Sequence, residues 1–287
     1  MHGLDLDVRS GEVLGLLGVN GAGKTTTLRM MAGVLAPDSG RVCLDGADLY
    51  EHPERARRRI GYLPEVPPLH EELSAEEFLR FCARLHGVAR GTVRAAVARA
   101  LERCDLGAVR RRPIATLSKG FRQRVGLAQA IVHEPALIVL DEPASGLDPV
   151  QALKLRALVR GIGADHAVVL STHTLPDVSA CCDRVAILHE GELRHCGALD
   201  DASGTLRIGF ERSLPAPPWA ALPMVADAAA VDATHWRVRL VAGTPVEALA
   251  RALAERGFAP TELVAGQDAL ERMFLAIAAG DAAAAAA

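Results

Sequence analysis

The sequence lacks several features that would place it in common classes of protein. No apolar run approaches the roughly 18 residues that a membrane-spanning helix needs, and the N-terminus has no basic stretch before an apolar segment, so neither a span nor a signal peptide is expected. The six cysteines form no CxxC pair, which excludes a zinc or disulfide framework and favours a reducing compartment. We expect the protein to serve any membrane process from outside the bilayer.

Aromatic side chains and lysine are also scarce. Aromatic residues make up only 3% of the chain, so alanine, leucine and valine supply most of the apolar surface. The formal net charge is -3, which gives no bulk electrostatic reason to expect a nucleic-acid partner. Lys24, Lys119 and Lys154 are the only lysines among 32 basic residues, so a lysine inside a motif stands out.

Short apolar segments alternate with helical patterns along most of the chain. Residues 13–17, 136–140, 167–171 and 185–189 have the length and composition of buried strands. Between about residues 64 and 133 helical periodicity replaces them, and Ser74 with Glu77 forms a capping box. The alternation predicts an α/β core with a mostly parallel sheet and a helical insertion.

A change of composition with three prolines between residues 203 and 218 indicates a domain boundary. We therefore expect a first domain over residues 1–203, with its helical subdomain at about 66–134. A small α+β accessory domain is expected over 204–280 and a disordered or frayed alanine-rich tail at 281–287. In the accessory domain, residues 236–241 predict a strand, Thr244 and Glu247 a capping box, and residues 268–279 a last helix.

A glycine-rich turn at residues 18–25 matches the pattern GxxxxGK[ST], after a predicted strand and before a predicted helix. Its glycines let backbone amides approach phosphate oxygens, and the helix N-terminus adds the positive end of its dipole. The lysine is expected at the β and γ phosphates and the Thr25 hydroxyl at Mg²⁺. GTPases, kinases and helicases share this P-loop NTPase motif. The predicted nucleotide-binding residues of the turn are Gly18, Val19, Asn20, Gly21, Ala22, Gly23, Lys24, Thr25 and Thr26.

The apolar strand at residues 137–140 ends in two carboxylates. Asp141 suits a Mg²⁺ partner, directly or through water, and Glu142 suits a general base for an attacking water. An acidic pair at a strand end is also common as ordinary solvated surface, so this pair takes its meaning from the other motifs.

Residues 117–123 read LSKGFRQ, and here the chain resembles the ATP-binding subunits of ABC transporters, whose signature reads LSGGQ. Ser118 stands at a predicted helix N-cap, Gly120 allows close backbone approach, and the helix dipole favours an anion. The resemblance implies that Ser118, Lys119 and Gly120 of one subunit cap the γ-phosphate of ATP held by another. Ser118 would also cap a core helix, and both roles can hold together.

Three further motifs stand in the order along the chain that the family shows. Residues 145–148 resemble the D-loop, His173 at a strand end resembles the switch histidine, and residues 62–65 stand in the place of the Q-loop. The resemblance covers roughly residues 3–200 and predicts a P-loop NTPase core with an inserted helical subdomain and a small α+β C-terminal region. It implies catalytic roles for Glu142 and His173, and Mg²⁺ ligation by Thr25, Glu65 and Asp141.

The chain departs from the family's pattern in three places. Lys119 and Phe121 replace a glycine and the glutamine of the signature, a variation that related exporters tolerate, and Glu65 replaces the usual glutamine of the Q-loop. Relatives also carry a preceding strand and an aromatic residue that stacks on adenine. We expect an in-frame extension upstream of Met1, the alternative being that adenine is held in another way.

Taken together, the motifs imply an ATP-binding and ATP-hydrolysing subunit that powers an ABC-type membrane transporter, with ATP and Mg²⁺ as cofactors. The runs at residues 118–130 and 172–191 resemble exporters of the ABC-2 group. The resemblance implies a homodimer, or a heterodimer with a paralogous subunit, together with a separate membrane permease and no nucleic acid. It places the protein in the cytoplasm, peripheral on the inner face of the cell membrane through that permease.

Two other functions remain as alternatives. A soluble ABC ATPase acting on ribosomes or DNA usually carries two tandem cassettes or a long coiled-coil insertion, and neither is present. A P-loop GTPase would carry a guanine-specific NKxD motif, which is absent because Asn20 is the only asparagine. Comparing ATP with GTP turnover separates the GTPase from the other two.

Overall fold

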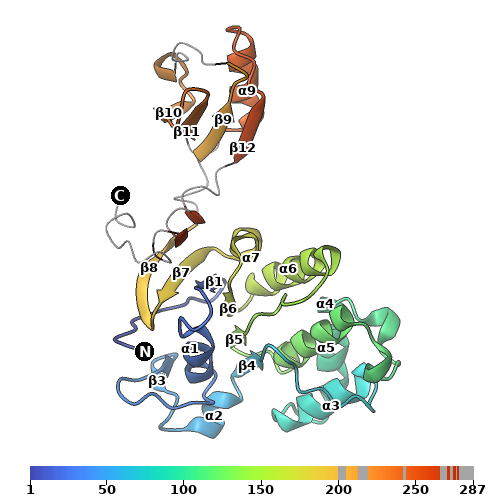
Figure 1. The fold of residues 1–287 in the computed structure, drawn as a ribbon. Coiled ribbons are helices and arrows are strands. Elements are labelled where there is room, and N and C mark those ends of the chain that lie inside the picture. The colour runs from blue at the N-terminus through green and yellow to red at the C-terminus, as the bar shows by residue number, and fades with distance from the viewer. Residues whose placement is uncertain are drawn as a thin grey trace. The chain divides into compact units, whose positions relative to one another are not determined.

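The computed structural model describes residues 1–199, 205–212, 219–241 and 244–265, with residues 270, 271, 274, 275 and 277. The chain divides into two compact units, Met1–Cys196 and Gly197–Ala287 (Figure 1). The predicted boundary at residue 203 and the predicted tail at 281–287 fall outside the described residues, so the expected domain limits stay predictions. Across the described part, no helix has the length and apolar character that crossing a membrane requires.

A six-stranded sheet forms the centre of the first unit, in the order β4-β5-β6-β1-β7-β8. The first five strands of that order run parallel. The last strand follows β7 after a turn at Glu190 and Gly191, whose φ angles of 50° and 80° suit a two-residue hairpin. The predicted α/β fold with a mostly parallel sheet is confirmed. The strands are β1 (Val13–Leu17), β4 (Ile60–Leu63), β5 (Leu137–Leu140), β6 (Ala167–Thr172), β7 (Arg184–His189) and β8 (Glu192–Ala198).

Helices cover both faces of this sheet, so β1, β5 and β6 are buried along their whole length. On one face, Leu28 of α1 packs with Leu14 and Leu16 of β1. On the other face, a Cβ at Gly61 of β4 would lie 2.0 Å from the Ala130 carbonyl oxygen, so only glycine allows this approach. The other elements of the first unit outside the helical insertion are α1 (Lys24–Met31), β2 (Cys43–Leu44), β3 (Ala47–Asp48), α2 (Pro53–Arg57), α6 (Pro149–Gly163) and α7 (Leu175–Cys181).

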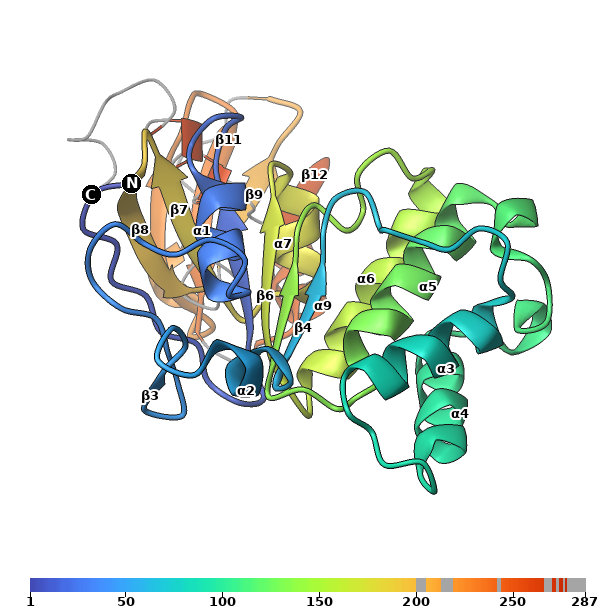
Figure 2. The same ribbon diagram turned by 90° about the horizontal axis from the view of Figure 1, so that it is seen from below.

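The helical insertion consists of α3 (Ala75–Leu85), α4 (Val93–Arg103) and α5 (Lys119–Ile131). Figure 2 shows these three helices gathered on one side of the strands. The Ser74 side chain accepts a hydrogen bond from the Glu77 amide while the Glu77 side chain accepts one from the Ser74 amide, which confirms the predicted capping box. Gly126 and Ala130, in the second half of α5, approach Leu63 and Gly61 of β4, whereas the signature residues lie at the opposite end of the helix.

The second unit is a four-stranded antiparallel sheet in the order β10-β11-β9-β12. One face packs against α9 (Val246–Ala254), which lies along the sheet in Figure 1 and buries Leu249 and Leu253 in the unit's core. The predicted small α+β region is confirmed. Its strands are β9 (Thr205–Gly209), β10 (Val225–Ala230), β11 (His235–Leu240) and β12 (Glu262–Ala265).

The capping box predicted at Thr244 is wrong. The helix α9 begins at Val246, its N-cap is Pro245, and no side chain caps it. A residue before proline is driven out of the helical region, and Pro245 is itself extended, with ψ of 139°. Thr244 therefore stands one position too early to cap the helix. The helix predicted at 268–279 lies largely outside the described residues.

Candidate functional site

The glycine-rich turn joins β1 to α1 at the carboxyl end of the parallel strands. Gly18 is buried, and a Cβ there would lie 2.6 Å from the Leu188 carbonyl oxygen. Gly21 and Gly23 adopt φ of 84° and 101°, in the left-handed region that favours glycine. Gly23 is the N-cap of α1 and Lys24 its first residue. The loop therefore presents its backbone immediately before a helix N-terminus, where anions bind.

The Lys24 side chain is buried, and its ammonium contacts three oxygen atoms of the chain. Its ammonium donates hydrogen bonds to the carbonyl oxygens of Gly18, at 2.7 Å, and Val19, at 3.3 Å. Glu142 Oε1 lies 3.7 Å from the same nitrogen. A buried charge is tolerated where it has such partners, so these contacts fix the ammonium inside the turn.

Asp141 directly follows β5 and accepts hydrogen bonds from two hydroxyl groups. Its Oδ1 accepts hydrogen bonds from Ser171 Oγ, at 2.7 Å, and from Thr25 Oγ1, at 3.3 Å. Only 3% of Asp141 is exposed to solvent. The structure thus brings Thr25 of the turn into direct contact with the first carboxylate of the strand end.

The Thr25 hydroxyl and the Asp141 carboxylate fit a Mg²⁺ ion, because they are hard oxygen donors beside a phosphate-binding turn. No group of three or more His, Cys, Asp or Glu side chains with metal-binding geometry occurs among the described residues. Mg²⁺ usually takes only one or two carboxylates together with water and substrate phosphates.

Glu65 follows β4 at the same edge of the sheet. Glu65 is exposed, and its side chain makes no hydrogen bond or ion pair with any part of the chain that the structure describes. The structure therefore does not bring Glu65 into contact with Thr25 or Asp141, and its role as a Mg²⁺ ligand stays a prediction.

Glu142 and His173 are in direct contact. The distance from Glu142 Oε2 to His173 Nδ1 is 2.8 Å, and the glutamate side chain is 13% exposed while the histidine side chain is 51% exposed. Glu142 has a φ of 47°, an unfavourable backbone conformation for a residue with a Cβ. Such a conformation persists where surrounding contacts stabilise it. Here the Glu142 carboxylate lies near the glycine-rich turn, with Oε1 3.7 Å from Lys24 Nζ.

Ser171 connects the two carboxylates, although it was not among the predicted site residues. Its hydroxyl donates to Asp141 and accepts a hydrogen bond from the Glu142 amide at 2.9 Å. The residue is fully buried at the end of β6. The available signal was a polar residue in an otherwise apolar strand, directly before Thr172 and His173.

The signature residues lie at the start of α5, away from the turn in the same chain. Ser118 is the N-cap of α5 and accepts a hydrogen bond from the Phe121 amide at 3.4 Å. Ser118 and Lys119 are exposed, whereas Gly120 is buried against Gln151, whose Oε1 would lie 2.8 Å from a Cβ at that position. Among the described residues, no hydrogen bond or ion pair joins residues 118–120 to residues 18–26. An exposed serine at a helix start is free to meet another molecule.

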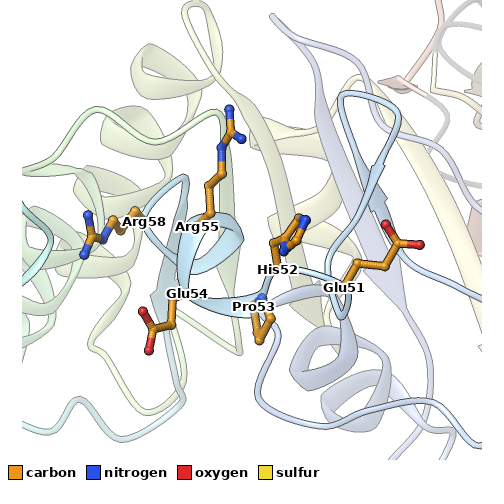
Figure 3. A pocket seen from close by; sticks show the side chains of 6 residues that line it. All are labelled: Glu51, His52, Pro53, Glu54, Arg55 and Arg58. Atoms are coloured by element: carbon orange, nitrogen blue, oxygen red, sulfur yellow. The ribbon is translucent and has the colours of Figure 1, made fainter.

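A separate hollow of about 510 Å³ lies over α2. Figure 3 shows Glu54, Arg55 and Arg58 pointing in different directions from this short helix. Because these charged side chains do not converge on a common point, the hollow offers no defined binding site. Its lining residues are Glu51, His52, Pro53, Glu54, Arg55 and Arg58.

Comparisons with known proteins identify the family of this chain. The family model described as ABC transporter matches residues 1–145. The uncharacterized ABC transporter ATP-binding protein YxlF of Bacillus subtilis is 40% identical over 194 residues, which cover 68% of this chain and 64% of YxlF. The bacitracin transport ATP-binding protein BcrA of Bacillus licheniformis is 35% identical over 192 residues, which cover 66% of this chain and 62% of BcrA. The chain thus spans just under two thirds of either relative.

A solved structure gives the same result for the fold. The cbiO1 protein of Clostridium perfringens, described as part of the ABC transporter complex cbiONQ, matches with a TM-score of 0.63 and 29% identity over 69% of this chain and 82% of cbiO1. The matched family domain is an ATPase domain with the P-loop fold. The family predicted from the motifs is confirmed, and this chain belongs to the ABC transporter family.

Proposed function

We propose that this chain is the ATP-binding and ATP-hydrolysing subunit of an ABC transporter and that it drives a separate membrane permease. The observation that carries the proposal is the continuous network from Lys24 and Thr25 through Asp141 and Ser171 to Glu142 and His173. The network brings an ammonium, hydroxyl groups, two carboxylates and an imidazole together at one edge of the sheet, which supports roles in phosphate binding, metal binding and base catalysis. Each of these groups has a defined role in phosphoryl transfer to water.

Binding of ATP is assigned to the turn at residues 18–26. The backbone amides before α1 face the phosphates, and the Lys24 ammonium adds a positive charge at the β and γ phosphoryl groups. Thr25 and Asp141 would hold Mg²⁺, which neutralises charge on the phosphate oxygens when bound. We retain Glu65 as a further ligand in this proposal.

Hydrolysis is assigned to Glu142 with the help of His173. A water oxygen forms a bond to the γ-phosphorus, the bond from that phosphorus to the β–γ bridging oxygen breaks, and a water proton passes to the Glu142 carboxylate. His173 contacts the same carboxylate at 2.8 Å and is thereby positioned to orient it and to reach the γ-phosphate. Electrostatic preorganisation of this kind avoids rearrangement during the reaction.

A second subunit would complete the site. Ser118 and Lys119 are exposed at the N-terminal end of α5, where a phosphate of ATP bound to a neighbouring subunit can be held. This supports a head-to-tail pair, formed by two copies or by one copy and a paralogue. ATP-driven closure of the pair would then move the helical insertion against a permease on the cytoplasmic face of the membrane.

The direction of transport is proposed to be export, of the ABC-2 kind. Support comes from the sequence runs at residues 118–130 and 172–191 and from BcrA, which is named for bacitracin transport. A role on ribosomes or DNA is disfavoured, because YxlF and BcrA are both named as ATP-binding proteins of transport systems. Purification with a membrane-embedded protein supports the permease, and purification with ribosomes and no membrane protein contradicts it.

The catalytic assignment is tested with Glu142→Gln, which keeps the shape of the side chain but removes the base. We expect ATP turnover to fall by about 10²- to 10⁴-fold, as for loss of a general base, while ATP binding is retained. The exposed Glu102→Gln on α4 is the matched control and should turn over ATP normally. Normal turnover by the Glu142 variant would contradict the assignment.

A further inference from the structure

The outer face of the second unit's sheet carries arginines on its two central strands. On β9 and β11, Leu206, Ile208 and Val238 are buried in the core beneath α9. Side chains alternate between the two faces of a strand, so Arg207 and Arg237 project from the opposite face.

Arg207 and Arg237 lie directly opposite one another in the antiparallel ladder. Two like charges in this arrangement destabilise a sheet. The Arg207 Nε atom is buried and makes no hydrogen bond, and neither arginine has an ion pair or hydrogen bond within the described residues. Leaving a buried donor unsatisfied is destabilising, so an acceptor supplied by a bound anion would stabilise this pair.

The basic side chains on either side of the pair have acidic neighbours. Arg239 is 4.0 Å from Asp227, and the two ring nitrogens of His235 lie 3.0 Å from Asp232 and 3.5 Å from Glu262. Arg207 and Arg237 therefore carry two positive charges without acidic partners among the described residues, whereas Arg239 and His235 on either side have such partners. On β10, the residue opposite Arg237 is Ala229, whose small side chain leaves room beside the guanidinium.

We propose that Arg207 and Arg237 form a binding site for a single phosphoryl group, of the phosphomonoester class. A dianion neutralises both guanidinium groups, whereas one carboxylate would leave one of them uncompensated. The planar donor fork of arginine matches phosphate oxygens, and the buried Nε of Arg207 gains an acceptor. Asp227 and Glu262 at the two ends of the site repel a long polyanion, so the site accepts a compact group and not a nucleic-acid backbone.

Phosphate binding is tested on the full chain by thermal unfolding followed through tryptophan fluorescence. Both tryptophans, Trp219 and Trp236, lie in the second unit, so the signal reports on this unit and not on the ATP site. Inorganic phosphate should raise the unfolding midpoint in a saturable way, whereas chloride at equal ionic strength should not. Ligand binding to the folded state stabilises it by mass action.

The variants Arg207→Gln and Arg237→Gln should each weaken the phosphate effect by about tenfold or more, as for loss of hydrogen bonds to a charged group. Without phosphate, either variant should unfold at the same temperature as the natural chain or higher, because a like-charge contact is removed. The control Arg251→Gln, on the helix that covers the opposite face, should keep the full phosphate response. These outcomes separate ligand binding from a purely structural role.

Three results would overturn the proposal: no difference between phosphate and chloride, an unchanged response in both sheet variants, or an equal loss in the Arg251 control. A further arm identifies the source of the phosphoryl group. Sedimentation with phosphatidylcholine vesicles that contain phosphatidic acid, abolished by Arg237→Gln, assigns it to a lipid headgroup. A phosphate response without vesicle binding assigns it to a soluble phosphomonoester.

Discussion

The charged side chains of the two sheets differ in whether they have partners within the chain. At the edge of the first sheet, Lys24, Asp141 and Glu142 each have a hydrogen-bond or charge partner within the chain. On the outer face of the second sheet, Arg207 and Arg237 lie side by side with none among the described residues. A satisfied network holds reacting groups in place before substrate arrives, whereas an unsatisfied pair gains stability only when an anion binds. Substitutions in either sheet test this difference.

The largest effect on stability is expected from Ile208→Ala, which tests whether the second unit is stabilised separately from the first. Ile208 is fully buried in that unit's core, and loss of such a side chain costs about 2–5 kcal/mol. The tryptophan-monitored unfolding midpoint should fall sharply, while ATP turnover below that temperature should stay unchanged. A parallel loss of turnover would show that the two regions depend on one another and would weaken the comparison.

Lys24→Ala tests the paired charges of the first sheet. Removing the ammonium leaves Glu142 without its cation and removes charge-assisted hydrogen bonds to phosphate, so ATP affinity should fall by about 10- to 100-fold. Equilibrium binding of a fluorescent ATP analogue measures this change. The exposed Lys154→Ala on α6 is the matched control, and equal affinities for both variants would contradict the role of Lys24.

Ser171→Ala tests the hydrogen bonds of the first sheet's network, because it removes a hydroxyl without changing the charge of the network. Asp141 would lose its 2.7 Å hydrogen bond and the Glu142 amide its only acceptor in the described part of the chain. We expect turnover to fall by about tenfold, equivalent to about 1.4 kcal/mol, with ATP binding little changed. Ser171→Thr, which restores a hydroxyl, should recover part of the turnover. A similar loss in both variants would indicate a packing role.

Motifs that are local in sequence could be predicted, and contacts that depend on tertiary geometry could not. The glycine-rich turn and the capping box at Ser74 each depend on a few adjacent residues whose chemistry fixes the backbone. Ser171 gained its role only when β6 was placed next to β5, in the register that sets Leu170 beside Leu140. The same limit applies to Arg207 and Arg237, because strand register decides which residues oppose each other and a shift of one residue would separate them.

The smallest expected effect is a pH dependence of the first unit's stability that is centred on His133. Its ring stacks on His86, with centroids 3.9 Å apart, while Nε2 lies 3.2 Å from the Ile60 carbonyl oxygen and Nδ1 is buried without a partner among the described residues. Burial, followed by the neighbouring His86, lowers the pKa of His133 to about 4, from an ordinary value of about 6.5. The folded state therefore favours the neutral ring and resists protonation.

Because the folded pKa is lowered, this contribution to stability is complete above about pH 6.5 and is lost as the pH falls toward 4. In His133→Phe, which keeps a ring in the stack but cannot titrate, urea unfolding followed by circular dichroism should show a weaker loss of stability between pH 7 and pH 5. The exposed His70→Phe should keep the natural slope. If the His133 variant lost stability as steeply as the natural chain, the acid sensitivity would have to come from groups other than His133.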